Sequence, residues 1–276
     1  MTRRHQLTYF LILPFLLPFL ATSRLAAQED TDRWLANCRE GDWDDHPRAC
    51  EVRETGMRAT SGPFTADPGK NGGVAIYGWD RDSVAVVAKI QTVARSEADA
   101  RDMLKDVRIE AQGRTVRAMG PTQTSRQHWS VSFDIYVPRH TDLTLETENG
   151  PLSVEEVSGT MDLHALNGPV SLIGVGGDVT ARVQNGPLSV HLAGDRWQGT
   201  GLDAETVNGP VDLAIPTPYN ARLETGTVNG PMDLSFPLTV TIQGHVSNRI
   251  QSTLGNGGAP VRVVTTNGPL SIRRAR

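Results

Sequence analysis

A two-residue alternation of apolar and polar positions runs through the second half of the chain, on both sides of a recurring Asn-Gly-Pro tripeptide. The tripeptide begins at six asparagines: Asn149, Asn167, Asn185, Asn208, Asn229 and Asn267. Successive asparagines are 18, 18, 23, 21 and 38 residues apart, and we interpret the last interval as two steps with one tripeptide lost. A period near twenty residues is typical of repeat proteins in which each unit stacks on its neighbours.

Within a repeat, the alternation predicts strands that bury one face. In the second repeat the apolar Leu163 and Ala165 flank the polar His164, and the same alternation restarts after the tripeptide at Val170. Side chains of a strand point alternately to its two faces, so one face is buried and the other is solvated. Each repeat therefore predicts a strand, an Asn-Gly-Pro corner, a second strand and a looser glycine corner such as Gly176-Gly177.

These repeats predict an all-β fold, namely a single-stranded, β-helix-like solenoid with coils of about 18–23 residues. Asn and Gly tolerate positive φ, and Pro, which lacks an N–H donor, fits the first residue of a strand. Because the asparagines share the parity of the buried positions, we expect them to be structural corner residues that point into the coil. Stacked about 4.8 Å apart, their amides would form a ladder. A ligand-binding row is the functional alternative, and an antiparallel β-sandwich is the alternative fold, since Asn-Gly also closes hairpins.

The N-terminus has the pattern of a secretory signal peptide. Arg3 and Arg4 precede an apolar run from Leu7 to Ala21, followed by small residues up to Ala27. We expect residues 1–27 to be removed on export, because the run of about 15 residues is too short to span a membrane well. The mature chain then has no transmembrane span. Removing three of the 27 basic residues leaves 24 against 31 acidic ones, a net charge of 24 − 31 = −7, which does not favour nucleic acid.

The two cysteines, Cys38 and Cys50, are expected to form a disulfide in an oxidising compartment. The bond would close a loop of 13 residues and contribute about 3 kcal/mol. Between them, the Asp42–His46 loop carries three carboxylates and an imidazole that could hold a divalent cation, although a solvated loop is the alternative. We interpret residues 28–70 as a disulfide-stapled N-terminal cap that forms one globular unit with the repeat domain, residues 71–276.

Between the cap and the first tripeptide the alternation is weaker but still predicts strands. Apolar residues alternate over residues 74–76, 84–88, 107–111 and 129–137. Ser96-Glu97-Ala98-Asp99 is typical of a capping box and predicts a short helix to about Lys105. It is the one helix that we expect after the signal peptide.

Two segments carry a resemblance to a known family. Tyr136-Val137-Pro138-Arg139 precedes the strand-Asn-Gly-strand repeats, and Leu254-Gly255-Asn256-Gly257-Gly258 precedes the closing repeat. Over residues 72–274 the chain resembles the bacterial putative-adhesin β-strand-repeat family, a domain family of unknown function. It departs from that family in having Pro after Asn-Gly, where an acidic or polar residue is usual. The resemblance implies an exported β-solenoid in or on the cell envelope, without catalytic residues or cofactors to carry over.

We therefore expect a non-catalytic protein of the cell envelope or surface with an adhesin-like binding or structural role. It would act in the periplasm, at the cell surface or outside the cell, and its partner would be an envelope protein, a glycan or another copy of the chain. No cofactor is expected. An envelope-stress sensing module is one alternative.

The other alternative is a polysaccharide-active enzyme that uses Asp212 and Asp233. These residues lie at equivalent positions of consecutive repeats, so stacking in register would place them about 4.8 Å apart, near the spacing of a retaining carboxylate pair. The same pair is a candidate cation site. Serine at the four sister positions favours a solvated strand face instead, and no nucleophile or zinc motif accompanies the pair.

Overall fold

The computed structural model describes residues 31–40, 46–237 and 249–275. The expected signal peptide, residues 1–27, lies outside this part of the chain, as do the first residues of the Asp42–His46 loop. The chain divides into two compact units, Met1–Gly41 and Asp42–Arg276. Within the described ranges, no helix is long and apolar enough to cross a membrane.

Two helices occur among the described residues, one more than the sequence analysis predicted. The expected helix is α2 (Glu97–Asp106), and the Ser96 hydroxyl oxygen accepts a hydrogen bond from the Asp99 backbone N at 3.1 Å, as a capping residue should. Residues 31–40 of the first unit form the other helix. Leu35 and Ala36 are good helix formers, but this segment was interpreted only as part of the disulfide-stapled cap.

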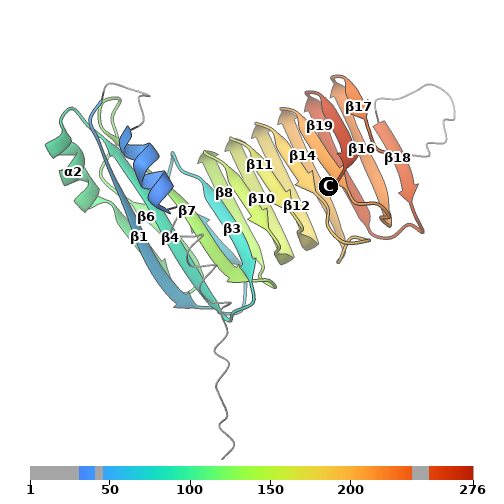
Figure 1. Ribbon diagram of the computed structural model, residues 1–276, viewed down its shortest axis with the longest axis horizontal. Helices are drawn as coiled ribbons and strands as arrows, with labels where there is room; N and C mark the ends of the chain where they lie inside the picture. The colour runs from blue at the N-terminus through green and yellow to red at the C-terminus, as the bar shows by residue number, and fades with distance from the viewer. Residues whose placement is uncertain (1–30, 41–45, 238–248, 276) are drawn as a thin grey trace, which may run out of the picture. The chain divides into compact units, whose positions relative to one another are not determined.

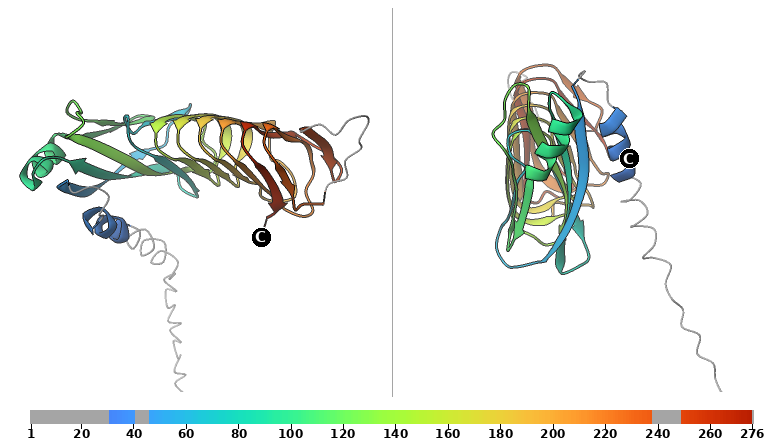
Figure 2. Two further views of the ribbon diagram at one scale, coloured as in Figure 1. Left: turned by 90° about the horizontal axis from the view of Figure 1, so that it is seen from above. Right: turned by 90° about the vertical axis from the view of Figure 1, so that its left-hand side faces the viewer.

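The second unit consists of two ten-stranded mixed sheets, which we call sheet A and sheet B and which Figure 2 shows as facing layers. In spatial order, the strands of sheet A are β1 (Arg48–Arg58), β4 (Ser83–Val93), β7 (His128–Pro138), β3 (Val74–Trp79), β9 (Leu152–Glu155), β11 (Val170–Ile173), β13 (Leu188–His191), β15 (Val211–Ile215), β20 (Leu270–Arg274) and β17 (Met232–Leu234). Those of sheet B are β18 (Arg249–Leu254), β16 (Ala221–Asn229), β19 (Pro260–Asn267), β14 (Gly201–Asn208), β12 (Gly176–Asn185), β10 (Ser158–Asn167), β8 (Leu143–Asn149), β2 (Phe64–Asp67), β6 (Thr115–Met119) and β5 (Arg108–Gln112). The all-β prediction is confirmed.

Each Asn-Gly-Pro repeat contributes one strand to each sheet. In sheet B, β10 pairs in parallel with β8 and β12, so that Asn167 aligns with Asn149 and Asn185. In sheet A, β11 pairs in parallel with β9 and β13. The predicted alternation holds, since Leu163 is buried and His164 is exposed. Because the repeat strands pair in parallel, the antiparallel sandwich is wrong for this region.

Antiparallel pairs flank the parallel repeats at both ends. β4 pairs antiparallel with β1 and β7 in sheet A, and β5 pairs antiparallel with β6 in sheet B. At the other end, β18 pairs antiparallel with β16. The sheets are therefore mixed, with the hydrophobic core between them; its largest fully buried side chain is Phe133.

The last repeat lies inside the array and not at its end. β19 pairs with β14 on one side and with β16 on the other, and β20 lies between β15 and β17. Figure 1 shows β19, in red, between the orange β14 and β16. The interpretation of the 38-residue interval as two successive steps is therefore wrong.

A glycine-rich turn makes this return possible. After β18, Gly255 and Gly257 adopt positive φ angles of 52° and 76°. The Gly257 N donates to the Leu254 carbonyl at 2.9 Å, and the Asn256 N donates to Asn220 Oδ1 at 2.8 Å. The turn thus passes the start of β16 and brings the chain from one side of that strand to the other.

Candidate functional site

The corner asparagines form one row of side-chain amide hydrogen bonds that crosses the repeats. Five bonds of 2.8–3.0 Å, each from the Nδ2 of one asparagine to the Oδ1 of the one before it, join them in the spatial order Asn149, Asn167, Asn185, Asn208, Asn267 and Asn229. At the start of the row, Asn149 Nδ2 donates to Asn71 Oδ1 at 3.3 Å. The amide ladder is present, but in the order that the inserted repeat imposes.

The orientation that we expected for these asparagines is wrong. Five of the six are exposed and Asn149 is half-buried. The inward alternation ends two residues earlier, at buried positions such as Ala165 and Val183. At the asparagine the backbone already turns toward the other sheet, so parity along the strand no longer fixes the direction of the side chain.

The structure separates the two aspartates of the enzyme alternative. Asp212 and Asp233 both align with Ser271, which lies on the strand between them. Two strand spacings put them about 10 Å apart and not 4.8 Å. Asp212 is also paired with Arg273, whose Nη2 lies 2.7 Å from Asp212 Oδ2. The expected adjacent carboxylate pair is therefore wrong, because it assumed that the repeats stack in sequence order.

The remaining sequence candidates have mixed outcomes. Cys38 and Cys50 are disulfide-bonded. Residues 41–45 lie outside the described part of the chain, so a cation site in the Asp42–His46 loop stays a prediction. Elsewhere in the described ranges, no group of three or more His, Cys, Asp or Glu side chains is placed to hold a metal ion.

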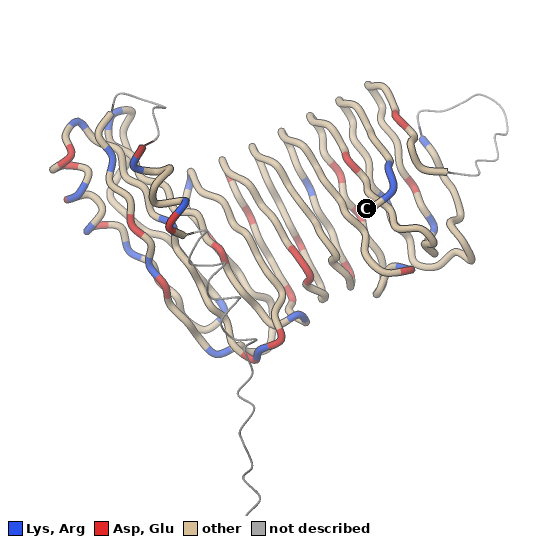
Figure 3. The backbone as a smooth tube through the Cα atoms, in the orientation of Figure 1, with Lys and Arg blue, Asp and Glu red and all other residues tan. Residues whose placement is uncertain are grey.

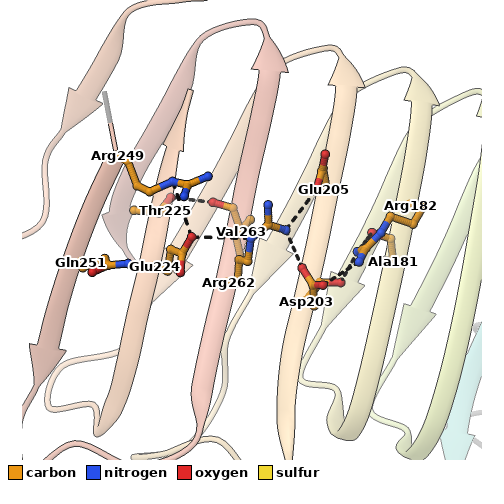
Figure 4. A network of polar contacts seen from close by, with 10 residues as sticks. All are labelled: Ala181, Arg182, Asp203, Glu205, Glu224, Thr225, Arg249, Gln251, Arg262 and Val263. Carbon is orange, nitrogen blue, oxygen red and sulfur yellow. Dashed lines mark hydrogen bonds and ion pairs between the residues drawn. The ribbon is translucent and has the colours of Figure 1, made fainter. Parts of the chain in front are cut away.

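A network of charged side chains crosses the outer face of sheet B where β19 lies between β14 and β16 (Figure 4). Arg262 Nη1 lies 2.6 Å from Asp203 Oδ1 and 3.0 Å from Glu205 Oε2. Arg262 Nε lies 3.7 Å from Glu224 Oε1. On the opposite side, Arg182 Nη2 lies 2.5 Å from Asp203 Oδ2. One arginine of the inserted repeat thus joins carboxylates from the strands on both of its sides.

The parallel register explains how these charges meet. Outward positions of neighbouring strands align, and Arg262 is aligned with Asp203 on β14 and with Glu224 on β16. The network could not be expected while the 38-residue interval was interpreted as two successive steps, because that puts Arg262 about two coils beyond Glu224. The sequence does contain one indication of the network. Asp203 and Arg262 lie at equivalent outward positions of their repeats, the same number of residues before Asn208 and Asn267.

Asp203 and Arg262 keep their charges at neutral pH. Burial works to raise the pKa of Asp203, but hydrogen bonds from Arg182 and Arg262 outweigh it and hold that pKa below its usual value. Burial likewise works to lower the pKa of Arg262, but hydrogen bonds to Asp203 and Glu205 raise it above its usual value. A group that exchanges protons in catalysis needs a pKa near the working pH, so these residues form a fixed charge pattern.

The charged network borders a groove of about 680 Å³. Its polar lining includes the hydroxyls of Thr180, Thr200 and Thr253 and the carboxylate of Asp178. Arg222 also lines the groove; it is exposed and forms no ion pair with another described residue. Figure 3 shows acidic and basic residues interspersed in the second unit. The groove is therefore lined by charged groups and hydroxyls, and Arg222 is the arginine in it that a ligand could pair with.

An aromatic cluster on the outer face of sheet A is less suited to bind a sugar. The rings of Tyr77 and Tyr136 are stacked at 5.2 Å, Trp79 lies 5.6 Å from Tyr136, and Arg81 lies 4.7 Å over Trp79. Burial, together with nearby Asp134, raises the pKa of Tyr77 to about 12. Because the Tyr77 and Tyr136 rings stack on each other and Arg81 lies over Trp79, the rings do not form an open platform. The groove on sheet B is therefore the stronger candidate site.

Comparisons with known proteins give one family match and several similar solved structures. The sequence profile of the Toastrack DUF4097 family matches residues 83–273. Among solved structures, a putative cell adhesion protein from Clostridium sporogenes has 9% identity and a TM-score of 0.41, covering 82% of this chain and 100% of its own. A putative adhesin from Bacteroides fragilis has 8% identity and a TM-score of 0.31, covering 82% and 97%. No curated protein sequence is significantly similar to the chain.

Proposed function

The chain belongs to the Toastrack DUF4097 family, and we propose that it is an exported, non-catalytic β-solenoid protein of the cell envelope or surface with an adhesin-like binding role. In this proposal the parallel coils form a rigid solenoid that presents the groove on sheet B to its ligand. Residues 1–27 are the signal peptide, and residues 28–70 are the disulfide-stapled cap of the repeat domain, residues 71–276. These divisions rest on the sequence pattern.

The single observation that carries the proposal is the groove beside the Asp203–Arg262–Glu224 row. A volume of about 680 Å³ lies within the range of small-ligand sites, about 300–1,000 Å³. Threonine hydroxyls and charged groups are hydrogen-bonding partners for the hydroxyls of a sugar. Because Arg222 is exposed and unpaired among the described residues, an acidic glycan is the ligand that the groove fits best.

Fixed charge favours binding over catalysis in this groove. Asp203 and Arg262 have pKa values shifted away from neutrality, in the directions that keep both charged. These two side chains therefore supply hydrogen bonds and ion pairs and do not act as an acid or a base. Solenoid surfaces serve other repeat proteins as extended binding faces.

Replacing Arg222 with alanine is expected to weaken binding of an acidic glycan about tenfold, because a hydrogen bond to a charged group contributes roughly 1.5–3 kcal/mol. The measurement is a glycan array with the mature protein, followed by titration of the best ligand. Stability should stay within about 0.5 kcal/mol, as for most exposed substitutions.

Arg108→Ala is the matched control for this experiment. Arg108 is an exposed strand residue on β5, remote in the order of sheet B from β16, and it forms no ion pair with another described residue. It should bind the glycan like the wild type. Equal losses in both variants, or no acidic glycan bound by the wild-type protein, would remove the groove as the binding site.

A further inference from the structure

The corner that begins at Asn229 differs from the other five in its hydrogen bonds. In those five, the N–H of the glycine donates to the backbone carbonyl of the asparagine on the next coil at 2.9–3.0 Å; these glycines are Gly150, Gly168, Gly186, Gly209 and Gly268. The outermost coil has no such neighbour in the described part of the chain. Gly230 N therefore donates to no described residue, and Asn229 Oδ1 accepts from none.

We propose that Asn229 is a site of spontaneous deamidation and is modified much faster than the other corner asparagines. In this reaction a base removes the proton of the Gly230 amide, and the nitrogen attacks Asn229 Cγ. The N–Cγ bond forms, the Cγ–Nδ2 bond breaks, and ammonia leaves with the proton that it needs. Water then opens the cyclic imide at either carbonyl, which gives aspartate or isoaspartate at position 229. The reaction involves no oxidation or reduction, and water is the co-reactant.

Geometry protects the interior corners in two ways. Their glycine N–H groups are engaged in hydrogen bonds, so the attacking nitrogen is not available. Their carboxamides are held at both ends, since Asn185 Nδ2 donates to Asn167 Oδ1 at 2.9 Å and Asn185 Oδ1 accepts from Asn208 at 2.9 Å. Asn229 keeps only the bond from its Nδ2 to Asn267 Oδ1 at 2.8 Å. Both Asn229 and Gly230 are exposed, so water and base reach them.

Two further Asn-Gly pairs outside the corners are also protected. Asn71 Nδ2 donates a hydrogen bond to Gln123 Oε1, and Asn71 Oδ1 accepts one from Asn149 Nδ2. The following residue, Gly72, is buried. After Asn256, the Gly257 N donates to the Leu254 carbonyl at 2.9 Å. Of the eight Asn-Gly pairs in the sequence, Asn229-Gly230 is therefore the one that we expect to deamidate fastest.

Modification would change the end of the amide row. A carboxylate at position 229 has no N–H to donate to Asn267 Oδ1, so the last bond of the row is lost. The chain also gains one negative charge at the corner between β16 and β17, beyond the residues of β16 that pair with β18. An isoaspartate would in addition lengthen the backbone at the end of β16 (Ala221–Asn229).

The test is peptide mapping by mass spectrometry after the folded wild-type protein has been incubated in mildly alkaline buffer. Asn229 lacks two hydrogen bonds that its equivalents have, so its deamidation should be about tenfold faster or more than at any other corner. The same protein in denaturant provides the matched control, because all six corners share the tripeptide Asn-Gly-Pro. There the six rates should converge to within about threefold, the usual scatter between contexts.

Three outcomes would overturn the inference. An interior asparagine such as Asn185 could react as fast as Asn229 in the folded protein. Asn229 could be faster by the same factor in denaturant, which would make the preference one of local sequence. Asn229 could also stay intact in the folded protein while it reacts in denaturant, which would show that its corner is protected like the others.

Discussion

Replacing Gly177 with alanine is expected to destabilise the folded chain by about 3 kcal/mol or more, because strain and steric overlap add at this position. Gly177 lies at the glycine corner that opens β12 and has a φ of +105°. A Cβ added there would lie 2.0 Å from the Gly159 carbonyl oxygen on the next coil. Since both groups belong to the backbone, relief requires that two coils move apart. Urea denaturation followed by circular dichroism measures the loss.

Gly194→Ala separates strain from overlap. Gly194 also has a positive φ, of +71°, but an added Cβ would meet no atom within 4 Å. Its replacement should therefore cost only the left-handed conformation, about 1–2 kcal/mol. If Gly177→Ala is no more destabilising than Gly194→Ala, the overlap with the Gly159 carbonyl oxygen adds nothing to the cost of the left-handed conformation.

Replacing Leu163 with alanine is expected to destabilise the protein by about 2–5 kcal/mol, as large-to-small changes in a packed core do. Leu163 is fully buried in the core between the sheets. It aligns with Leu145 on one neighbouring strand and with Ala181 on the other. Because the neighbouring coils are fixed by their parallel ladders, they are not free to collapse into the cavity. The midpoint of urea denaturation reports the change.

The adjacent His164 provides the control for this substitution. Its side chain is exposed and its Nε2 lies 2.9 Å from Asp162 Oδ1. An exposed pair of this kind contributes about 0–1 kcal/mol, so His164→Ala should be mild. Equal losses at residues 163 and 164 would show that the strand does not bury one face.

Local structure was predictable because it depends on local pattern. The alternation around Leu163 and Val170 reports which face of each strand is buried, and this requires no knowledge of the neighbouring coil. Ser96 and Asp99 report the start of α2 in the same way. The helix at residues 31–40 was missed because the segment was interpreted from its cysteine as part of a stapled cap, although it contains good helix formers.

The order of the coils was not predictable from the same pattern. All six corners have the same Asn-Gly-Pro chemistry, so the alternation around Asn267 is equally compatible with either side of Asn229. The stacking order is decided by the turn at residues 255–258 and by β18, which returns the chain across the start of β16. Such choices depend on contacts between segments far apart in sequence.

The candidate site was not predictable either, because it depends on the order in which the repeats stack. The sequence predicts only that three residues point outward from their strands: Asp203, Arg262 and Glu224. The insertion of the last repeat places Arg262 between the two acidic residues. The same insertion separates Asp212 from Asp233. The direction of the corner asparagines was not predictable for a different reason. The two-residue alternation gives the direction of a side chain within a strand, but not at the residue where the strand ends.

The last repeat lies between the fourth and the fifth repeats, and engineered disulfides test this order most directly. Neighbouring parallel strands are about 4.8 Å apart, which suits a disulfide, whereas about 10 Å does not. Three double variants are oxidised and mapped by mass spectrometry: Asp212→Cys with Ser271→Cys, Ser271→Cys with Asp233→Cys, and Asp212→Cys with Asp233→Cys. The structure predicts efficient cross-linking in the first two and none in the third. Cross-linking of residues 212 and 233, with residue 271 linked to 233 but not to 212, would contradict it.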